Sequence, residues 1–522
     1  MNKLSKFFLL ALFIGLSLPI YSKGPKYIFF FIGDGMGFGH VEATRLFLDE
    51  TKSTENLLFL DFPIVTHAVT QSADHRITDS AAAATALATG SKTANYTVGM
   101  DSSRTYALTP ISKQLKKTGR QIGIITTATI DHATPAGFYA TQPDRNLYYQ
   151  IGKQAAESGF DFFGGASLLK PVNNDNPQDI DLYTYFRKMG YTICNDFKNY
   201  DKSTKNGKIV LLYDTLGTKH IPYEIDRKSG TLSLKELTQT CLNRFMNNPK
   251  QGFFMMIEGG TIDWAAHSND AATMIQETIG FNESIKVAYD FYLKHPKETL
   301  IIVTADHETG GIGLGIKDSN LPISFLQKQK VSEENLSDIL YQLKERKSSP
   351  SWEDAKEILK KNLGLWEYIP VSYSEEAELM RIFDASFISK RAKDITNLYS
   401  TVGPLTNAVI SLVNQKAHIG WTSNNHTGAV VPVYVIGVGQ EQFSGRLDNT
   451  DIPNTIRKIT GIKFFKPEYD DPKYFESFRG QVAFYCWSSG EYETISKWEK
   501  VFDRTELEKY LSTDGTLRVR YQ

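Results

Sequence analysis

Short, uninterrupted apolar runs recur along the chain, and each one ends in a cluster of small and charged residues. Apolar runs without polar alternation are typical of central strands in a parallel sheet that is covered on both faces. The runs span residues 27–32, 122–127, 253–257 and 300–304, and they lead into Gly33-Asp34-Gly35, Asp131-His132-Ala133-Thr134, Glu258-Gly259-Gly260 and Asp306-His307-Glu308.

Helical stretches separate these runs. One of them, residues 233–247, begins at Ser233 with Glu236 three positions later, which is the pattern of a capping box. The alternation predicts an α/β fold: a three-layer sandwich with a largely parallel central sheet and helices on both faces, plus a mostly helical insertion. In such sheets ligands bind beyond the carboxyl ends of the strands, so the polar clusters should meet at one edge.

The predicted insertion covers residues 316–405. This stretch is rich in Lys, Glu and Leu, and helices are expected to start at Ser332, Ser351 and Ser374, each followed by acidic residues. The predicted organisation is therefore a catalytic domain made of residues 23–315 and 406–463, the insertion within it, and a C-terminal segment of unknown role at 464–522.

The first residues have the pattern of an export signal. Lys3 and Lys6 precede the apolar run 7–20, and the small Ser22 follows it. This pattern predicts a signal peptide at residues 1–22 and export to the periplasm or the medium. The apolar run is shorter than the roughly 20 residues needed to span a bilayer, so no transmembrane segment is expected after cleavage. The three cysteines allow at most one disulfide.

Charge and composition narrow the function only slightly. The formal net charge is −1 over 522 residues, and 41% of the residues are hydrophobic, as in an ordinary globular protein. No whole-protein field therefore favours nucleic acid or an anionic membrane, and no nucleic-acid partner is expected. Local clusters must carry the functional argument.

Ser80 is the candidate nucleophile. It follows Asp79, a good N-cap residue, and precedes the Ala-rich stretch 81–86, which favours a helix. The positive end of a helix dipole stabilises an alkoxide and attracts a phosphate group. The alternative is a serine that only caps the helix, which is a common role for this residue type.

Several carboxylates and imidazoles at the strand ends form candidate metal sites. Asp263 and His267 are four residues apart and would share one face of a helical turn. Mixed Asp and His ligands suit zinc, whereas oxygen ligands alone suit magnesium. Taken singly, each residue is explained as well by a surface ion pair or a buried structural histidine. The zinc-type residues are Asp263, His267, Asp306, His307 and His426, and the magnesium-type residues are Asp34, Thr134 and Glu258.

Six short motifs occur in order along the chain. They are Phe31-Ile32-Gly33-Asp34-Gly35-Met36-Gly37, Thr78-Asp79-Ser80-Ala81-Ala82, His132-Ala133-Thr134-Pro135-Ala136, Glu258-Gly259-Gly260-Thr261-Ile262-Asp263 with His267, Thr304-Ala305-Asp306-His307-Glu308-Thr309-Gly310-Gly311, and His426-Thr427-Gly428. A single motif of this kind is weak evidence, but six in order are specific. In this order the chain resembles the alkaline phosphatase family over residues 26–315 and 418–437.

The resemblance implies hydrolysis of phosphate monoesters to an alcohol and inorganic phosphate. The family uses a phosphoserine intermediate, two zinc ions and one magnesium ion. It commonly forms homodimers, so the resemblance allows a homodimer without requiring one. Carried over by motif, the resemblance implies one zinc site at Asp263, His267 and His426, and a second at Asp34, Asp306 and His307 with Ser80. It implies a magnesium site at Asp34, Thr134 and Glu258. It also implies that Arg145 clamps two phosphate oxygens with its planar fork.

Two positions depart from the bacterial pattern. Some members carry Asp and Lys where this chain has His132 and Trp264. His132 does not offer a carboxylate and Trp264 does not offer an ammonium group, so magnesium affinity, phosphate affinity and pH optimum are expected to differ. His418 and Trp421 are candidates for supporting His426, and structural packing is the competing interpretation.

Two other classes of function compete with this prediction. A phosphodiesterase, phosphonate hydrolase or sulfatase would reuse a two-metal site, although no Cys/Ser-x-Pro-x-Arg motif occurs near position 80. A catalytically silent metal-binding surface protein would be expected to lack the nucleophile or a zinc ligand, yet the motifs are complete.

Overall fold

The computed structural model describes residues 24–195, 207–347, 349–388, 403–462, 483–486 and 491–494. Its contacts divide the chain into two units, residues 1–464 and 465–522. In the second unit, strands β15 (Ala483–Cys486) and β16 (Glu491–Thr494) pair antiparallel. The predicted signal peptide at residues 1–22 lies outside the described residues. None of the described helices combines the length and apolar character needed to cross a membrane.

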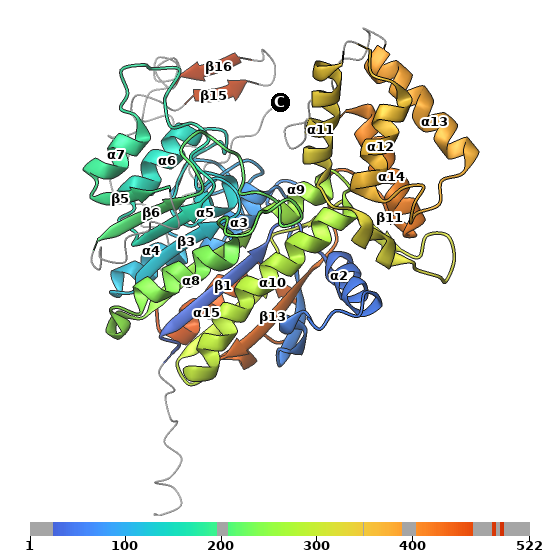
Figure 1. The fold of residues 1–522 in the computed structure, drawn as a ribbon. Helices are drawn as coiled ribbons and strands as arrows, with labels where there is room; N and C mark the ends of the chain where they lie inside the picture. The colour runs from blue at the N-terminus through green and yellow to red at the C-terminus, as the bar shows by residue number, and fades with distance from the viewer. Residues whose placement is uncertain are drawn as a thin grey trace, which may run out of the picture. The chain divides into compact units, whose positions relative to one another are not determined.

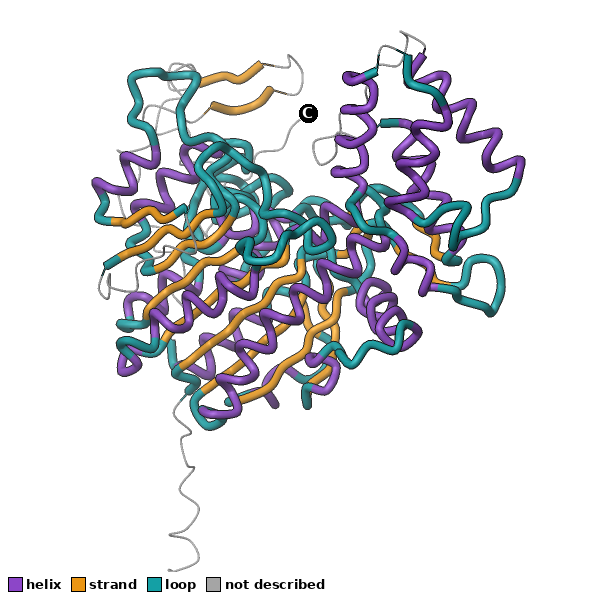
Figure 2. The backbone as a smooth tube through the Cα atoms, in the orientation of Figure 1, coloured by secondary structure: helices purple, strands orange, loops and turns teal. Residues whose placement is uncertain are grey.

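A ten-stranded, mostly parallel sheet forms the centre of the first unit (Figures 1 and 2). Its order is β14-β2-β13-β8-β1-β7-β3-β4-β6-β5, and β13 runs antiparallel to both of its neighbours. The strands are β1 (Tyr27–Gly33), β2 (Ile64–Val69), β3 (Gln121–Thr126), β4 (Phe162–Gly165), β5 (Tyr191–Cys194), β6 (Lys208–Leu212), β7 (Phe253–Gly259), β8 (Thr299–Thr304), β13 (Val431–Gly437) and β14 (Leu447–Asp448).

Side chains of β1 show why the strand lacks polar alternation. Phe29 and Phe31 contact the aromatic rings of Phe291 and Phe281 on α10 (Ala271–Lys294). Phe30, which points the other way along the pleat, contacts Phe138 at the end of α5 (Ala133–Gly137). Helices therefore cover both faces of the sheet, and the predicted α/β sandwich is confirmed.

The helices of this unit begin with ordinary local signals. Ser233 accepts a hydrogen bond from the Glu236 backbone nitrogen and starts α8, as its sequence predicts. Besides α5 and α10, the helices around the sheet are α2 (Phe38–Glu50), α3 (Ser80–Thr89), α4 (Ile111–Lys117), α6 (Tyr148–Glu157), α7 (Leu182–Lys188), α8 (Leu234–Phe245), α9 (Thr261–His267) and α15 (Asp451–Thr460).

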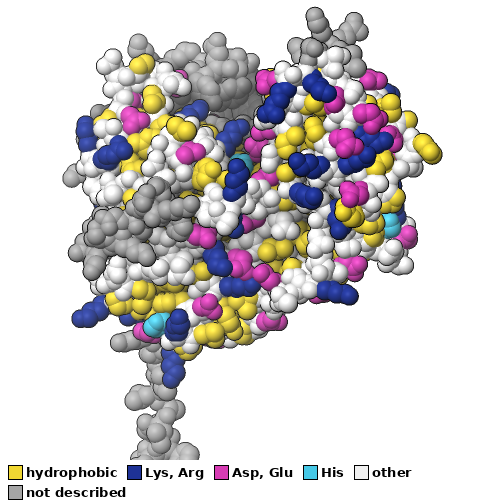
Figure 3. Space-filling model, in the orientation of Figure 1, with side chains coloured by type: hydrophobic (Ala, Val, Ile, Leu, Met, Phe, Trp, Pro, Cys, Tyr) yellow, Lys and Arg dark blue, Asp and Glu magenta, His cyan; other side chains and the backbone are white. Residues whose placement is uncertain are grey.

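Four further helices lie in and after the predicted insertion and group together in Figure 1, in yellow to orange. They are α11 (Glu333–Arg346), α12 (Trp352–Leu363), α13 (Tyr373–Phe383) and α14 (Pro404–Lys416). Ser332 and Ser351 are N-caps as expected. The expected start at Ser374 is wrong by two residues, because Ser372 forms the capping box with Glu375. On the face shown in Figure 3, basic and acidic side chains are interspersed over this part of the chain.

Candidate active site

The sheet register brings three polar clusters to one edge. Strand β1 lies between β7 and β8 and is parallel to both, with Gly33 opposite Gly259 and Ile32 opposite Thr304. The residues that follow these strands therefore emerge side by side. Gly35 has a φ of +73°, and a Cβ there would lie 2.9 Å from the Asp263 side chain, so the close approach of the loop after β1 to α9 (Thr261–His267) requires glycine.

Ser80 is the first residue of α3, at the helix N-terminus that the sequence predicts. Asp79 is the N-cap, and its Oδ1 accepts a hydrogen bond from the Ala82 nitrogen at 3.0 Å. The Ser80 hydroxyl is buried, and its Oγ lies 3.2 Å from Nε2 of His307. The helix thus presents this oxygen to the carboxyl edge of the sheet.

Three oxygens converge on Nε2 of His307. Besides Ser80 Oγ, they are Asp34 Oδ1 at 3.4 Å and Asp306 Oδ2 at 3.3 Å. Ligand atoms about 2.0–2.2 Å from a tetrahedral zinc ion are separated by roughly 3.3–3.5 Å, so this spacing fits a zinc site. Within the described residues, both oxygens of Asp34 and Oδ2 of Asp306 have no hydrogen-bond partner although they are buried. Buried oxygens of this kind are what a bound cation would satisfy.

Asp263, His267 and His426 form a second group. One turn of α9 places His267 Nε2 at 3.3 Å from Asp263 Oδ2, and His426 Nε2 lies 3.8 Å from Asp263 Oδ1. Each imidazole turns its Nδ1 toward a backbone carbonyl: His267 at 2.6 Å from Asn424, and His426 at 2.9 Å from Thr78. This arrangement leaves Nε2 of both rings directed at the carboxylate, as metal-binding histidines require.

A short strand pair explains how His426 reaches the site. Strand β12 (His426–Thr427) pairs antiparallel with β9 (Glu308–Thr309), with His426 opposite Thr309. The ring of His426 then stacks on that of His307, with centroids 3.6 Å apart. The two ligand groups are therefore immediate neighbours.

Asp34, His132 and Glu258 form a third group, with one potential ligand atom from each within 4.8 Å of the others. Thr134, the remaining predicted magnesium ligand, is fully buried at the start of α5. Its hydroxyl and Oε1 of Glu258 have no hydrogen-bond partner among the described residues. The oxygens fit a hard cation, and His132 adds a nitrogen that the predicted magnesium set did not include.

Burial and mutual repulsion set the electrostatics of the site. Burial, reinforced by Asp263 and Glu258, raises the pKa of Asp306 to about 8. Burial also raises the pKa of Glu258 to about 7. At Asp263 burial acts in the same direction, but His267, His426 and His307 together outweigh it and hold the pKa of this carboxyl well below its usual range. Several desolvated carboxylates around one point call for compensating cations.

Arg145 lies beside the N-cap of α3, next to the predicted nucleophile Ser80. Its Nη1 donates to Asp79 Oδ2 at 3.0 Å, and its Nη2 lies 3.3 Å from His132 Nε2. The side chain is almost fully buried. Its guanidinium is thus held between the N-cap of α3 and the third ligand group, where it can meet a phosphate that approaches Ser80.

Comparison with known proteins decides the family. The alkaline phosphatase family model matches residues 25–462. The chain belongs to the alkaline phosphatase family. It is 32% identical over 443 residues to alkaline phosphatase 4 of Bacillus subtilis, covering 82% of this chain and 87% of that protein. It is 30% identical over 455 residues to alkaline phosphatase of Schizosaccharomyces pombe, covering 83% and 81%.

Solved alkaline phosphatases have the same fold. The cold-active enzyme from the psychrophile Shewanella sp. aligns with a TM-score of 0.70 and 28% identity, covering 83% of this chain and 99% of that one. The Thermus thermophilus enzyme aligns with a TM-score of 0.71 and 26% identity, covering 87% and 96%. The chain is thus a hydrolase of phosphate monoesters that depends on divalent metals, as the family is.

The candidate active site also contains polar residues to which the sequence assigned no role. Thr309 Oγ1 donates to Asp263 Oδ1 at 2.5 Å. Glu308 accepts hydrogen bonds from the Thr427 hydroxyl and from the Gly311 nitrogen. Thr309 and Glu308 both lie inside the recognised motifs, so their position was a signal, but their partners Asp263 and Thr427 come from distant segments that only the fold brings together.

The two candidate supporting residues near His426 have separate surroundings. His418 Nδ1 lies 2.7 Å from the Asn320 carbonyl, next to Asp318. The ring of Trp421 packs against His40 at 5.9 Å. Neither contact is with His426, which favours structural packing for both.

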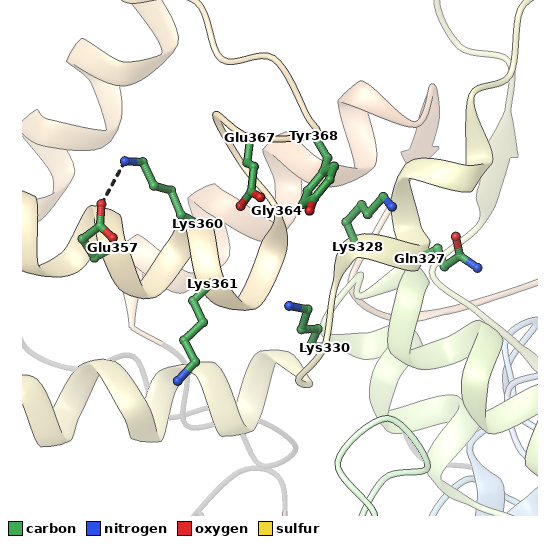
Figure 4. Close-up of a pocket in the computed structure, with 9 residues that line it drawn as sticks. All are labelled: Gln327, Lys328, Lys330, Glu357, Lys360, Lys361, Gly364, Glu367 and Tyr368. Atoms are coloured by element: carbon green, nitrogen blue, oxygen red, sulfur yellow. Dashed lines mark hydrogen bonds and ion pairs between the residues drawn. The ribbon is translucent and has the colours of Figure 1, made fainter.

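A cavity of about 510 Å³ lies away from the alkaline phosphatase site, next to α12. Figure 4 shows its lining, in which Lys360 is paired with Glu357. Lys328 lies over the ring of Tyr368 instead. None of the predicted catalytic or metal-binding residues lines this cavity.

Proposed function

We propose that this alkaline phosphatase hydrolyses phosphate monoesters through a phosphoserine formed on Ser80, at a site for two zinc ions and one magnesium ion. The observation that carries the proposal is the convergence of Ser80, Asp34 and Asp306 on Nε2 of His307 at 3.2–3.4 Å. At this point a hydroxyl at a helix N-terminus lies beside buried carboxylate oxygens that have no hydrogen-bond partner among the described residues.

The three ligand groups define where the ions would bind. Zinc would be held by Asp263, His267 and His426 in one position and by Asp34, Asp306 and His307 in the other, and magnesium by Asp34, Glu258 and Thr134, with His132 nearby. When bound, these ions would favour the deprotonated form of the nucleophile and neutralise charge on the transferring phosphoryl group.

The side chains of the site then have separate tasks. Ser80 Oγ bonds to phosphorus while the ester oxygen departs and leaves as the alcohol. A water molecule next bonds to phosphorus, the bond to Ser80 breaks, and serine and inorganic phosphate are regenerated. The helix dipole of α3 favours negative charge at Ser80 in both steps.

Arg145 would orient the phosphate. Its planar fork offers parallel N–H donors to two phosphate oxygens, and Asp79 fixes its direction through the 3.0 Å hydrogen bond. This preorganisation means that little reorientation is needed when the substrate arrives. His132 and Trp264 flank the same place, and their rings are in contact at 5.8 Å.

We further infer small phosphate monoesters as substrates, export after removal of residues 1–22, and a possible homodimer as the assembly to test. The catalytic unit is assigned to residues 23–315 and 406–463, with residues 316–405 as an insertion and 464–522 as a separate segment. Size-exclusion chromatography with light scattering measures the assembly directly.

The activity assay compares p-nitrophenyl phosphate with bis-p-nitrophenyl phosphate at pH 7 to 10, before and after chelation. Monoester hydrolysis that is lost on chelation and restored by zinc with magnesium is expected. Acid quenching with a labelled monoester should trap label on the protein. Preference for the diester would move the function to a phosphodiesterase, and absence of both activities in the zinc-loaded protein would contradict the proposal.

A further inference from the structure

His220 lies between the predicted active site and the helical insertion. Its Nε2 is 3.0 Å from Oε2 of Glu334, which belongs to the first turn of α11. Burial disfavours the charged form of both groups, yet their pairing raises the pKa of His220 and lowers the pKa of Glu334. The two shifts agree with each other, so the contact favours the charged form of both groups.

On its other side, His220 contacts the candidate active site through a chain of rings. Its imidazole packs edge-on against Trp264, with centroids 5.1 Å apart and an interplanar angle of 81°. Trp264 in turn packs against His132 at 5.8 Å. His132 Nε2 lies 3.3 Å from Arg145 Nη2. An uninterrupted set of contacts therefore joins Glu334 to the predicted phosphate clamp.

The backbone holds the His220 end of this chain in place. The nitrogen of Ile221 donates to the Thr127 carbonyl at 2.8 Å, and His220 itself forms a bridge with Ala128. Both partners follow directly on β3, beside the third ligand group. The imidazole thus starts from a rigid part of the catalytic unit.

The start of α11 is held equally firmly. Asp226 Oδ1 accepts a hydrogen bond from the Ser332 nitrogen at 3.0 Å, and Asp270 Oδ2 accepts one from the Glu333 nitrogen at 2.8 Å. Both acceptors belong to the catalytic unit rather than to the insertion. These hydrogen bonds fix the start of α11, so the partly exposed side chain of Glu334 reaches the buried ring of His220 from a fixed backbone position.

We propose that Glu334 and His220 are positioning residues for the phosphate pocket: through Trp264 they hold His132 and Arg145 in place. The insertion then contributes to catalysis by holding the phosphate pocket in position, and it supplies no group that touches the substrate. This inference rests on the proposed function for the roles of His132 and Arg145. A purely structural role for the ion pair would instead affect stability alone.

The test compares Glu334→Gln with Glu378→Gln. The control removes an exposed ion pair of the same insertion, in which Glu378 and Arg381 lie 2.6 Å apart on one helix. Glu334→Gln should raise both KM and the inhibition constant of inorganic phosphate by about 3- to 10-fold, with a smaller change in kcat. It should also raise the magnesium concentration for half-maximal binding, measured by calorimetry. Glu378→Gln should leave all four values unchanged.

Variants of His220, combined with Glu334→Gln in a double-mutant cycle, separate the effect of the ring packing from that of the ion pair. His220→Ala removes both the ring packing and the ion pair, whereas His220→Phe keeps only the ring, so the effect on phosphate inhibition should be larger for His220→Ala. Adding Glu334→Gln to His220→Ala should produce no further change, because the two side chains act through one contact.

Two results would overturn the inference. One is an unchanged phosphate inhibition constant in both Glu334→Gln and His220→Ala, whatever happens to the melting temperature. The other is full additivity of the two substitutions. Direct binding of inorganic phosphate and magnesium, measured by calorimetry, keeps this test separate from the proposed function: if the wild-type protein binds both but does not hydrolyse monoesters, only the proposed function fails.

Discussion

At the carboxyl edge of the sheet, Asp34 and Asp306 are fully buried and carry oxygens without donors, as seen for the described residues. In the predicted helical insertion, charged side chains lie near the surface and pair within or between adjacent helices, as Lys347 does with Asp354 at 2.5 Å. The two regions use the same residue types in opposite ways. One region tolerates desolvated charge that burial alone disfavours, and the other avoids it.

The difference separates residues that are explained by folding stability from residues that need a function to explain them. A segment that obeys local rules throughout, with serine caps and exposed ion pairs, is explained by folding alone. Buried carboxylates without partners are not explained in that way, because each one lowers stability unless a ligand compensates. The following variants test whether substitutions at the carboxyl edge of the sheet change activity while substitutions in the insertion change only stability, with Glu334 as the proposed exception.

Ser80→Ala should have the largest effect. Removal of Oγ eliminates the attacking atom, so kcat/KM for p-nitrophenyl phosphate should fall by roughly 10³-fold or more. No label should be trapped on the protein after acid quenching. Ser102→Ala, at an exposed serine in a neighbouring loop, is the control and should keep full activity. Label retained on the Ser80→Ala protein would contradict the assignment of the nucleophile.

Arg145→Lys should come next. Lysine keeps the charge but loses the planar fork, so one of two parallel hydrogen bonds to phosphate disappears. We expect kcat/KM to fall by about 10²-fold and phosphate inhibition to weaken. Arg76→Lys, at an exposed arginine, controls for the substitution itself. A change smaller than threefold in Arg145→Lys would show that the guanidinium geometry is unimportant.

The insertion contains one exception to the contrast, Glu333. It is buried, its Oε1 has no hydrogen-bond partner among the described residues, and burial together with Asp270 raises its pKa to about 8. Because the folded-state pKa lies above the ordinary value of 4.5, the folded state binds the proton more tightly than the unfolded state. Its contribution to stability is therefore complete below about pH 4.5 and is lost as the pH rises toward 8.

Glu333→Gln should remove this pH dependence. The amide has the same shape and stays neutral, so at pH 8 the variant should be more stable than the wild type by about 4 kcal/mol, with a difference of less than about 1 kcal/mol at pH 5. Chemical denaturation at both pH values measures this. Glu345→Gln, at an exposed position of the same helix, should show no such difference. Equal stability of Glu333→Gln and wild type at pH 8 would mean that Glu333 is solvated or paired.

The sequence predicted much of this contrast but not all of it. Unalternating apolar runs predicted the buried strands, and Ser332 and Ser351 predicted helix starts, because these signals are local. The expected start at Ser374 was wrong since two serines compete there and Ser372 has the glutamate at the capping distance. Contacts such as Arg145 with Asp79, or His220 with Glu334, join segments far apart in sequence, and no local pattern specifies them.

Ser351→Ala should have the smallest effect. It tests whether a substitution in the insertion that only weakens a helix cap leaves the active site unchanged. The serine caps α12 and forms a reciprocal capping box with Asp354, so its loss should lower the free energy of unfolding by about 1 kcal/mol. Ser349→Ala, at an exposed serine just before the helix, is the matched control. Neither variant should alter kcat/KM or phosphate inhibition. Glu334, which forms the proposed contact with His220, belongs to α11 and not to α12. If Ser351→Ala weakened phosphate inhibition as Glu334→Gln is expected to do, the coupling would belong to the insertion as a whole and not to the single contact at His220.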